Sequence, residues 1–330
     1  MTTQNKNQIE TISKRPVLLV DGLNVFTRHF CSNPTLGVNG QPIGGVVGFL
    51  NEISRKSETL NPERVIVVWE GGGSTYRRSL YSDYKSKRKP QKLNRYYEGD
   101  IPDTIGNRSW QVAALVQIMR TLPIQQSYVT DCEADDVIGY IAKYRFKDKN
   151  CVIVSSDKDY YQLLSDRVKI WSPTSKSFVN ENNVIERFGC SVKNFISTRC
   201  FVGDGADGID GVTGAGWKTI IKRFPELSES VEIMPDEIID KSAQLMKESK
   251  IKLYKDIVEE ADLARLNWKL MTLDVSILSG TQVGKIDSAI EMFKPEVNKL
   301  NYIKTLNKLS IGNFDRENVY TNIVSSLMNI

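Results

Sequence analysis

The sequence is poor in histidine and has no paired cysteines. Its 330 residues include a single histidine, His29, and five cysteines (31, 132, 151, 190 and 200) that form no Cys-x-x-Cys pair. These counts exclude catalysis by paired imidazoles and argue against a structural zinc site. We interpret His29 as a packing or surface residue. Scattered cysteines in odd number are typical of a reducing cytosol, not of a secreted disulfide framework.

Long apolar runs are also missing. The longest are four or five residues, such as Val17–Val20, which is far too short for a membrane span. Residues 1–15 lack the apolar core of a signal peptide, so we expect a mobile polar tail there. The net charge of +4 neither demands nor excludes a polyanionic partner. At roughly 150 residues per domain, the length predicts about two domains.

Short β-branched runs alternate with helical patterns in the first half of the chain, which predicts an α/β fold with a mostly parallel central sheet flanked by helices. The predicted strands are Val17–Val20, Val65–Trp69, Cys151–Ser155 and, more weakly, Gln125–Val129. The predicted helices are Gly44–Leu60, Trp110–Leu122 and Ala134–Phe146.

Strand patterns fade near Asn183, and helical patterns such as that of Pro235–Met271 continue to the end. We therefore predict a core over 16–185 and a helical C-terminal region over 186–330. Because no Pro- or Ser-rich linker separates them, we expect the two to pack as one body.

Acidic residues follow each of the four predicted strands. They are Asp21, Glu70, Glu133, Asp135, Asp136, Asp157 and Asp159. Ligands of open parallel sheets bind beyond the carboxyl ends of the strands, so these acids should surround one crevice.

Such a cluster needs positive charge nearby, because neighbouring carboxylates repel one another and resist joint ionisation. Mg²⁺ prefers carboxylate oxygens, and the number of acids indicates two ions about 3.5–4 Å apart, as in phosphodiester hydrolysis. Each acid taken alone could simply cap a helix or face its dipole. The four strand ends together favour a metal-dependent phosphotransfer site.

A basic segment lies close to these acids in the sequence. Residues 76–95 contain eight Lys and Arg against one acid, Asp83, and tyrosines interleave with them. Basic side chains neutralise phosphates and aromatic rings stack on unpaired bases. A solvated loop is the alternative interpretation. Because this segment lies beside a carboxylate site, we favour the interpretation that it binds nucleic acid.

A glycine-rich turn comes later in the chain. Asp204 and Asp207 precede Gly211, Gly214 and Gly216, which could form a hairpin whose amides approach a phosphate closely. A helix beginning near Lys218 would add its N-terminal dipole. A plain connection between helices is the alternative.

Taken in order, these motifs resemble the 5′-nuclease superfamily: flap endonucleases, the 5′–3′ exonuclease domain of bacterial DNA polymerase I, and phage 5′-nucleases with ribonuclease H activity. The resemblance covers roughly residues 17–224. The matching motifs are Val20-Asp21-Gly-Leu-Asn, Glu70 with Tyr76-Arg77 and Tyr84-Lys85-Ser-Lys-Arg88, Glu133-Ala-Asp135-Asp136, Ser156-Asp157-Lys-Asp159, and Gly203-Asp204-x-x-Asp207 with its hairpin.

The resemblance implies a role for each matching residue. One metal ion would be surrounded by Asp21, Glu70, Glu133 and Asp135, and the second by Asp157, Asp159, Asp204 and Asp207, with Asp136 nearby. The catalytic groups would be Lys85, Arg88 and Arg77, the first two at the base of a helical arch over about 85–109. The DNA-binding residues would be Tyr84, Lys87, Lys89, Gly211, Gly214, Gly216, Lys218 and Thr219. The last five would belong to a helix–three-turn–helix element, over about 190–224, that grips duplex DNA with a monovalent cation such as K⁺.

Three positions depart from the family pattern. Glu70 stands where the family usually has Asp. Gly208 and Asp210 replace the usual Asn and Pro, and the charge of Asp210 should loosen the grip on phosphates.

We therefore predict a Mg²⁺-dependent nuclease specific for 5′ structures, with Mn²⁺ as an alternative ion, in DNA replication or repair. Its substrates would be 5′ flaps, nicks or RNA–DNA junctions, including RNA primers. We expect a monomer in the cytoplasm of a bacterial or phage-infected cell, with replication proteins as partners and no membrane contact. Two alternatives are a PIN-type metal-dependent ribonuclease, which lacks the hairpin and the Asp204/Asp207 pair, and a non-catalytic DNA-junction binding protein, which would not need nine acidic positions.

Overall fold

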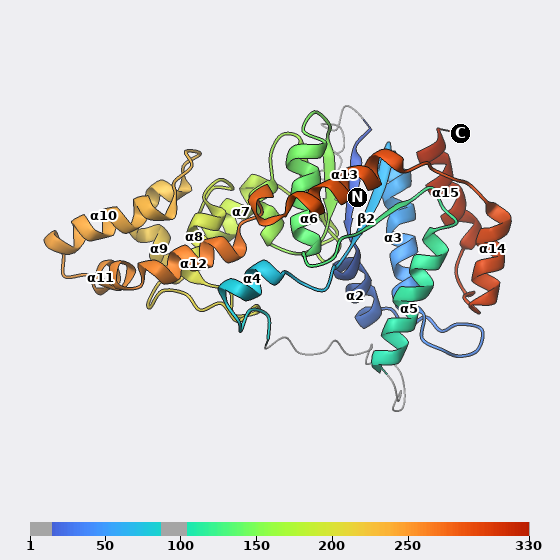
Figure 1. Ribbon diagram of the computed structural model, residues 1–330, viewed down its shortest axis with the longest axis horizontal. Helices are drawn as coiled ribbons and strands as arrows, with labels where there is room; N and C mark the ends of the chain where they lie inside the picture. The colour runs from blue at the N-terminus through green and yellow to red at the C-terminus, as the bar shows by residue number, and fades with distance from the viewer. Residues whose placement is uncertain (1–14, 87–103, 330) are drawn as a thin grey trace.

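The computed structural model describes residues 15–86 and 104–329. Residues 1–14 of the predicted N-terminal tail and most of the predicted arch lie outside this part of the chain. A central sheet is covered by helices on both faces, and a group of helices extends away from one side of it (Figure 1).

The sheet has six strands in the order β3-β2-β1-β4-β5-β6, and only β6 is antiparallel to its neighbour. The mostly parallel sheet is thus confirmed. The strands are β1 (Val17–Asp21), β2 (Arg64–Trp69), β3 (Gln125–Tyr128), β4 (Cys151–Val154), β5 (Val168–Ser172) and β6 (Ser177–Val179). The first four match the predicted strands within a residue or two, and the last two were not predicted.

The apolar pattern of β1 explains why the sheet lies between two layers of helices. All five of its residues are buried, and alternate side chains point to opposite faces. Val17 and Leu19 belong to one hydrophobic cluster, whereas Leu18 and Val20 belong to the other. A strand that is apolar on both faces can be stable only between two layers of helices.

The helices form two groups. One cluster is shared by α2 (Gly22–Ser32), α3 (Gly44–Leu60), α5 (Thr104–Met119), α14 (Lys299–Lys308) and α15 (Arg316–Met328). The other contains α6 (Ala134–Tyr140), a π-helical turn (Ile141–Arg145), a 3₁₀ turn (Asp159–Leu163), α7 (Glu181–Phe188), α8 (Phe195–Val202), α9 (Trp217–Arg223), α10 (Pro235–Glu248), α11 (Lys252–Glu259), α12 (Ala261–Met271) and α13 (Gly280–Met292). The short helix α4 (Thr75–Leu80) and the 3₁₀ turns Pro225–Ser228 and Val275–Ile277 complete the described elements.

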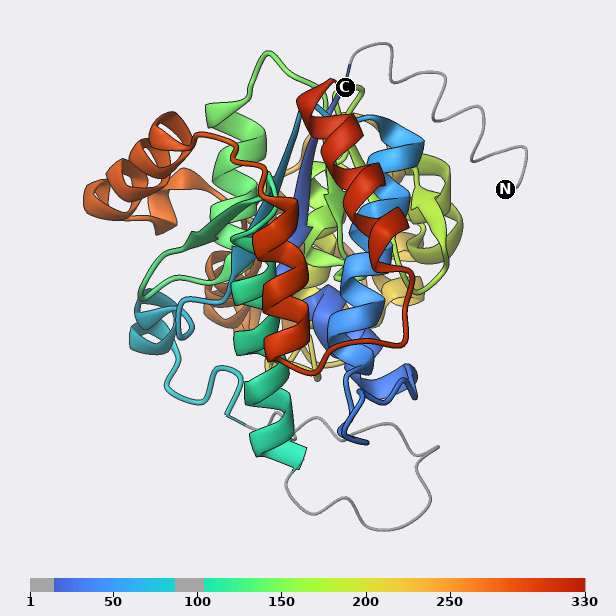
Figure 2. The ribbon, with the colours of Figure 1, turned by 90° about the vertical axis from the view of Figure 1, so that its right-hand side faces the viewer.

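The helices of the C-terminal region contribute to both hydrophobic clusters. Helices α8 to α12 make up the extension, but α14 and α15 return to the sheet and lie beside α3 and α5 (Figures 1 and 2). Tyr302, Leu306 and Ile323 are fully buried there. Because α3 is buried along most of its length, it needs more cover than α2 and α5 supply.

Local patterns misplaced several helix boundaries. The predicted helix Trp110–Leu122 begins earlier, at Thr104, and Ala134–Phe146 changes to a π-helical turn after Tyr140. The run Pro235–Met271 is divided into three helices. Within residues 15–86 and 104–329, no helix is long and apolar enough to cross a membrane.

Replacing a core residue of α15 tests its contribution to the fold. Ile323→Ala removes a fully buried side chain, so we expect the free energy of unfolding to fall by about 2–5 kcal/mol in urea denaturation. Thr321→Ala, at an exposed position of the same helix, should change it by less than about 0.5 kcal/mol. Equal effects of the two substitutions would contradict the packing of α15 on the core.

Candidate active site

Six of the nine predicted acidic ligands line one cavity at the carboxyl end of the sheet. The cavity has a volume of ≈ 1040 Å³. Its acidic residues are Asp21, Glu70, Glu133, Asp135, Asp157 and Asp207, and its basic residues are Arg78, Lys85 and Arg108. Strands β3, β2, β1 and β4 are adjacent in the sheet, so their ends bring together five of these acids, and Asp207 joins them from the turn between α8 and α9.

Asp21 serves both as a helix cap and as a cavity residue. Its Oδ1 accepts a hydrogen bond of 3.1 Å from the backbone N–H of Asn24, which caps α2. Its Oδ2 accepts hydrogen bonds from the hydroxyls of Ser155 and Tyr160, at 3.1 and 3.2 Å. Burial raises the pKa of Asp21 to about 7, and the charge of Asp157 adds to this effect.

Glu70 and Asp157 face the cavity from the ends of β2 and β4. The Oε2 of Glu70 accepts from the backbone N–H of Ala134, at 3.4 Å, in the first turn of α6. Burial, followed by the charges of Asp135 and Glu133, raises its pKa to about 7. Burial also raises the pKa of Asp157.

Lys85 lines the cavity and contacts two of its acids. Its Nζ lies 2.5 Å from Oε1 of Glu133 and 3.9 Å from Oδ2 of Asp207. Although burial opposes its charge, the neighbouring carboxylates of Asp135, Glu133 and Asp207 raise its pKa. Its backbone has a φ of 58°, which is unfavourable for lysine, and its N–H donates to the carbonyl of Asp207 at 2.9 Å. The ammonium group is therefore held in place and stays charged.

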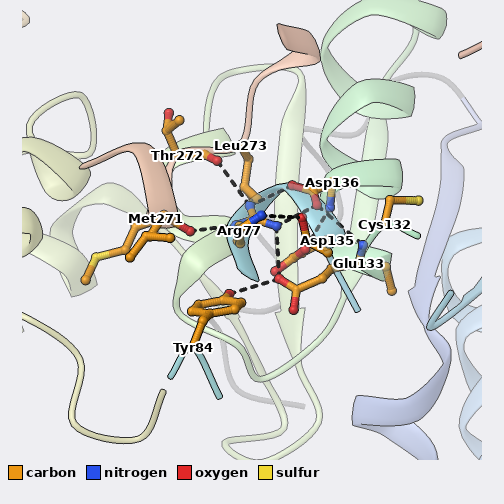
Figure 3. A network of polar contacts seen from close by, with 12 residues as sticks. Arg77, Tyr84, Cys132, Glu133, Asp135, Asp136, Met271, Thr272 and Leu273 are labelled. Atoms are coloured by element: carbon orange, nitrogen blue, oxygen red, sulfur yellow. Dashed lines mark hydrogen bonds and ion pairs between the residues drawn. The ribbon is translucent and has the colours of Figure 1, made fainter. Parts of the chain in front are cut away.

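Arg77 lies behind the cavity, where it neutralises two acids (Figure 3). Its side chain is only 1% exposed. Nη1 lies 2.9 Å from Glu133 and 2.6 Å from Asp136, Nη2 lies 2.7 Å from Asp136, and Nε donates to the carbonyl of Leu270 at 2.7 Å. This location corrects the prediction that Arg77 is catalytic, because a buried guanidinium with these partners does not face the cavity.

The same network includes two further predicted residues, Asp136 and Tyr84 (Figure 3). Both carboxylate oxygens of Asp136 bind Arg77, and one of them also lies within 4.8 Å of oxygens of Glu133 and Asp135, a group that could hold a metal ion. Tyr84 is 7% exposed and donates its hydroxyl to Glu133 at 2.9 Å. The ring of Tyr84 is therefore not available to stack on a base.

Arg199, in α8, was missed by sequence reasoning. It forms ion pairs with Asp159, at 2.7 Å, and with Asp204. Neither acid lines the cavity. Burial and the charge of Asp157 raise the pKa of Asp159 to about 8, whereas Arg199 opposes this shift. Two of the four acids predicted for the second ion, Asp159 and Asp204, are thus paired with an arginine.

The glycine-rich turn connects α8 to α9. The backbone groups of Asp204 and Ile209 hydrogen-bond to each other at 2.8 and 2.9 Å. Gly203 has a φ of 81°, and a Cβ atom there would lie 2.4 Å from the nitrogen of Gly211, so the turn needs glycine at this point. The predicted DNA-binding positions that are exposed are Gly214, Gly216, Lys218 and Thr219. The predicted residues Lys87, Arg88 and Lys89 lie outside the described residues.

The donor set fits a hard divalent cation. The carboxylates that line the cavity come from five separate segments of the chain, and burial raises the pKa of three of them, Asp21, Glu70 and Asp157. Grouped carboxylate oxygens at a water-accessible edge are ligands that Mg²⁺ or Mn²⁺ prefers. Arg78 and Arg108, at the rim, are further cations that the prediction did not assign.

Comparisons with known proteins identify the family of this chain. A family model described as "5′-3′ exonuclease, N-terminal resolvase-like domain" matches residues 16–189. A 5′-3′ exonuclease of Aquifex aeolicus is 26% identical over 289 residues, covering 80% of this chain and 94% of the relative. Flap endonuclease Xni of Shewanella loihica is 28% identical over 273 residues, covering 81% and 94%.

The fold also resembles solved structures. A flap endonuclease of bacteriophage T5, in a pseudo-enzyme-product complex with DNA and metal ions, aligns with a TM-score of 0.64 at 20% identity. The alignment covers 89% of this chain and 98% of that chain. At this identity the likeness establishes the fold alone.

Removing the buried guanidinium tests its structural role. Arg77→Met leaves Glu133 and Asp136 without their shared counter-ion, so we expect the free energy of unfolding to fall by about 3–5 kcal/mol. The neighbouring exposed residue provides the control, because Arg78→Met should cost less than about 0.5 kcal/mol. Urea denaturation at pH 7.5 measures the free energy of unfolding of both variants. If Arg77→Met lowers it as little as Arg78→Met does, Arg77 is not a buried counter-ion.

The raised pKa values predict how the stability of the metal-free protein depends on pH. Asp21 and Glu70 have pKa values of about 7 in the folded protein, against about 3.9 and 4.3 unfolded. The folded state therefore binds more protons up to this range, so its stability should fall as the pH rises from about 6 to 8. His29, with a pKa of about 4, acts in the opposite direction, but as a single group.

Chemical denaturation in EDTA across this pH range measures the effect. Asp21→Asn should flatten the dependence, because it removes one of the titrating groups. Added Mg²⁺ should restore stability at pH 8. A stability that rises between pH 6 and 8 in EDTA would show that the folded state does not hold these extra protons.

Proposed function

We propose, since this chain belongs to the 5′-3′ exonuclease family, that it hydrolyses phosphodiester bonds at the 5′ ends of nucleic acids as a structure-specific nuclease. The observation that carries the proposal is the set of carboxylates from four adjacent strand ends in one open cavity beside a fixed lysine. The names of the relatives, 5′-3′ exonuclease and flap endonuclease, support the same activity.

Divalent ions are the cofactor that this cavity fits. Asp21, Glu70, Asp135, Asp157 and Asp207 would hold them, with Mg²⁺ as the physiological ion and Mn²⁺ as a substitute. Two such ions supply Lewis-acid stabilisation of the attacking and leaving oxygens in phosphoryl transfer. The acidic residues would bind and position these ions, and no histidine base is required.

Lys85 would bind an oxygen of the reacting phosphate. Its ammonium lies at the cavity wall and remains charged, and its backbone is fixed by the hydrogen bond to Asp207. A cation positioned in advance stabilises the negative charge that develops on the phosphate during cleavage. Arg78 and Arg108, which also line the cavity, would attract the nucleic acid to it.

The turn between α8 and α9 would hold the duplex part of the substrate. Its exposed glycines allow a phosphate to approach the backbone, and Lys218 adds a positive charge. In this proposal the element is a helix–three-turn–helix that takes a K⁺ ion. The substrates are DNA with 5′ flaps or nicks and RNA–DNA junctions, handled by a monomer in replication or repair together with replication proteins.

Cleavage of a labelled 5′-flap duplex tests the activity. Product should form with Mg²⁺ and not with EDTA, and a blunt duplex should be cut more slowly. Binding of the flap without cleavage under any divalent ion would favour a non-catalytic junction-binding protein. Cleavage of single-stranded RNA in preference to the flap would favour a PIN-type ribonuclease.

Replacing one carboxylate separates cleavage from binding. Asp157→Asn should reduce cleavage at least about 100-fold, because it removes a ligand oxygen's charge, while DNA affinity in Ca²⁺ stays equal or rises as repulsion of the phosphates falls. Asp148→Asn removes the same charge at an exposed position elsewhere and should leave both unchanged. Near-normal cleavage by Asp157→Asn would remove Asp157 from the site.

A further inference from the structure

Two buried hydroxyl groups contact Asp21 from behind the acidic cavity. The Oδ2 atom of Asp21 accepts a hydrogen bond from Ser155 at 3.1 Å and another from Tyr160 at 3.2 Å. Ser155 and Tyr160 are fully buried, and neither of them lines the cavity. Tyr160 directly follows Asp159, the last acid of its sequence motif, and the sequence assigned it no role.

The direction of both hydrogen bonds is set by the groups around them. The backbone N–H of Asp157 donates to Oγ of Ser155 at 3.1 Å, so the single hydroxyl hydrogen of Ser155 is left for Asp21. Within residues 15–86 and 104–329, the hydroxyl of Tyr160 has Asp21 as its only hydrogen-bond partner. An ionised carboxylate can only accept, so both hydroxyls donate to it.

Tyr160 belongs to the segment that carries the acids after β4. It lies in the 3₁₀ turn Asp159–Leu163, and its ring is part of the hydrophobic cluster that contains α6. Asp157 is tied to the same turn, because its Oδ1 accepts from the backbone N–H of Asp159 at 3.0 Å. A fully buried ring in a close-packed interior has little freedom to move. Tyr160 therefore connects the carboxylate at the end of β1 to the acids at the end of β4.

Three hydrogen bonds from three segments fix the orientation of the Asp21 carboxylate. The backbone N–H of Asn24 occupies Oδ1, and the two hydroxyls occupy Oδ2. A carboxylate has about four acceptor positions, so about one stays open for an ion in the cavity that Asp21 lines. Mg²⁺ demands near-ideal octahedral geometry, so a ligand held in one orientation favours its binding.

We propose that Tyr160 is a positioning residue, whose hydroxyl presents Asp21 to the divalent ion and keeps it aligned with the acids after β4. The inference rests on the proposed function, because it concerns the ions that these carboxylates would hold. Tyr160 does not bind the ion or the substrate itself, since it is buried outside the cavity lining. Groups that orient a metal ligand in this way typically change metal affinity about 10- to 100-fold.

Binding of Mn²⁺ in the absence of nucleic acid tests this role. Electron paramagnetic resonance measures free Mn²⁺ at pH 8 as the protein is titrated. Tyr160→Phe keeps the buried ring and removes only the hydroxyl, so we expect the Mn²⁺ affinity to fall at least about tenfold. Tyr161→Phe is the matched control, because the hydroxyl of Tyr161 makes no hydrogen bond within the described part of the chain. It should bind Mn²⁺ like the wild type.

A double-mutant cycle shows whether Tyr160 acts through Asp21. Asp21→Asn should itself weaken Mn²⁺ binding, because it removes the charge of a ligand. In the Asp21→Asn background, Tyr160→Phe should change the remaining affinity by less than about twofold. Ser155→Ala removes the other hydroxyl donor and should also weaken Mn²⁺ binding. Circular dichroism and thermal unfolding in EDTA confirm that each variant is folded.

The outcomes separate the positioning role from the proposed function. If the wild type binds Mn²⁺ and Tyr160→Phe binds it equally well, the inference alone is overturned. Equal losses in the wild-type and Asp21→Asn backgrounds overturn it as well, because Tyr160 would then act independently of Asp21. If Tyr160→Phe does not fold, Ser155→Ala decides, and unchanged Mn²⁺ affinity in that variant overturns the inference. A wild-type protein that does not bind Mn²⁺ overturns the divalent-ion site of the proposed function, and this inference with it.

Discussion

The pairing of Arg77 with Glu133 and Asp136 is the interaction on which the rest of the site depends. Charges removed from water are tolerated only when they are paired and hydrogen-bonded, and the five N–H groups of an arginine can satisfy several acceptors at once. Arg77 comes from α4, its acidic partners from the start of α6, and its carbonyl partner Leu270 from α12. One side chain thus joins the sheet edge to the helical extension (Figure 3). The other carboxylate oxygen of Glu133 pairs with Lys85.

The acids of the cavity could be predicted because their position depends on topology alone. Asp21, Glu70 and Asp157 follow buried strands that pair in parallel, and parallel strands end at the same edge. The family resemblance read from the same motifs is confirmed by the match over residues 16–189. Strands β5 and β6 were not predicted: Lys169 interrupts the apolar run of β5, and β6 has only three residues.

Burial was the property that the sequence did not reveal. Arg77 and Tyr84 lie in a basic, tyrosine-rich run that is typical of a nucleic-acid surface, yet both are buried against Glu133. Arg199 lies in an apolar helix that gave no indication of a distant acidic partner. Asp204 follows it by five residues, but Asp159 reaches it only because the fold brings α8 next to the end of β4. Charge pairs between distant segments follow from tertiary packing and not from local composition.

The return of α15 to α3 has a consequence for how the protein is made. The apolar side of α3, residues 44–60, is fully covered only after α15, residues 316–328, has been synthesised. At roughly 5–20 residues per second, a ribosome needs on the order of tens of seconds to translate the intervening chain. During that time part of the hydrophobic surface of the nascent core stays uncovered. This face is therefore completed only late in translation, after α15 has been synthesised.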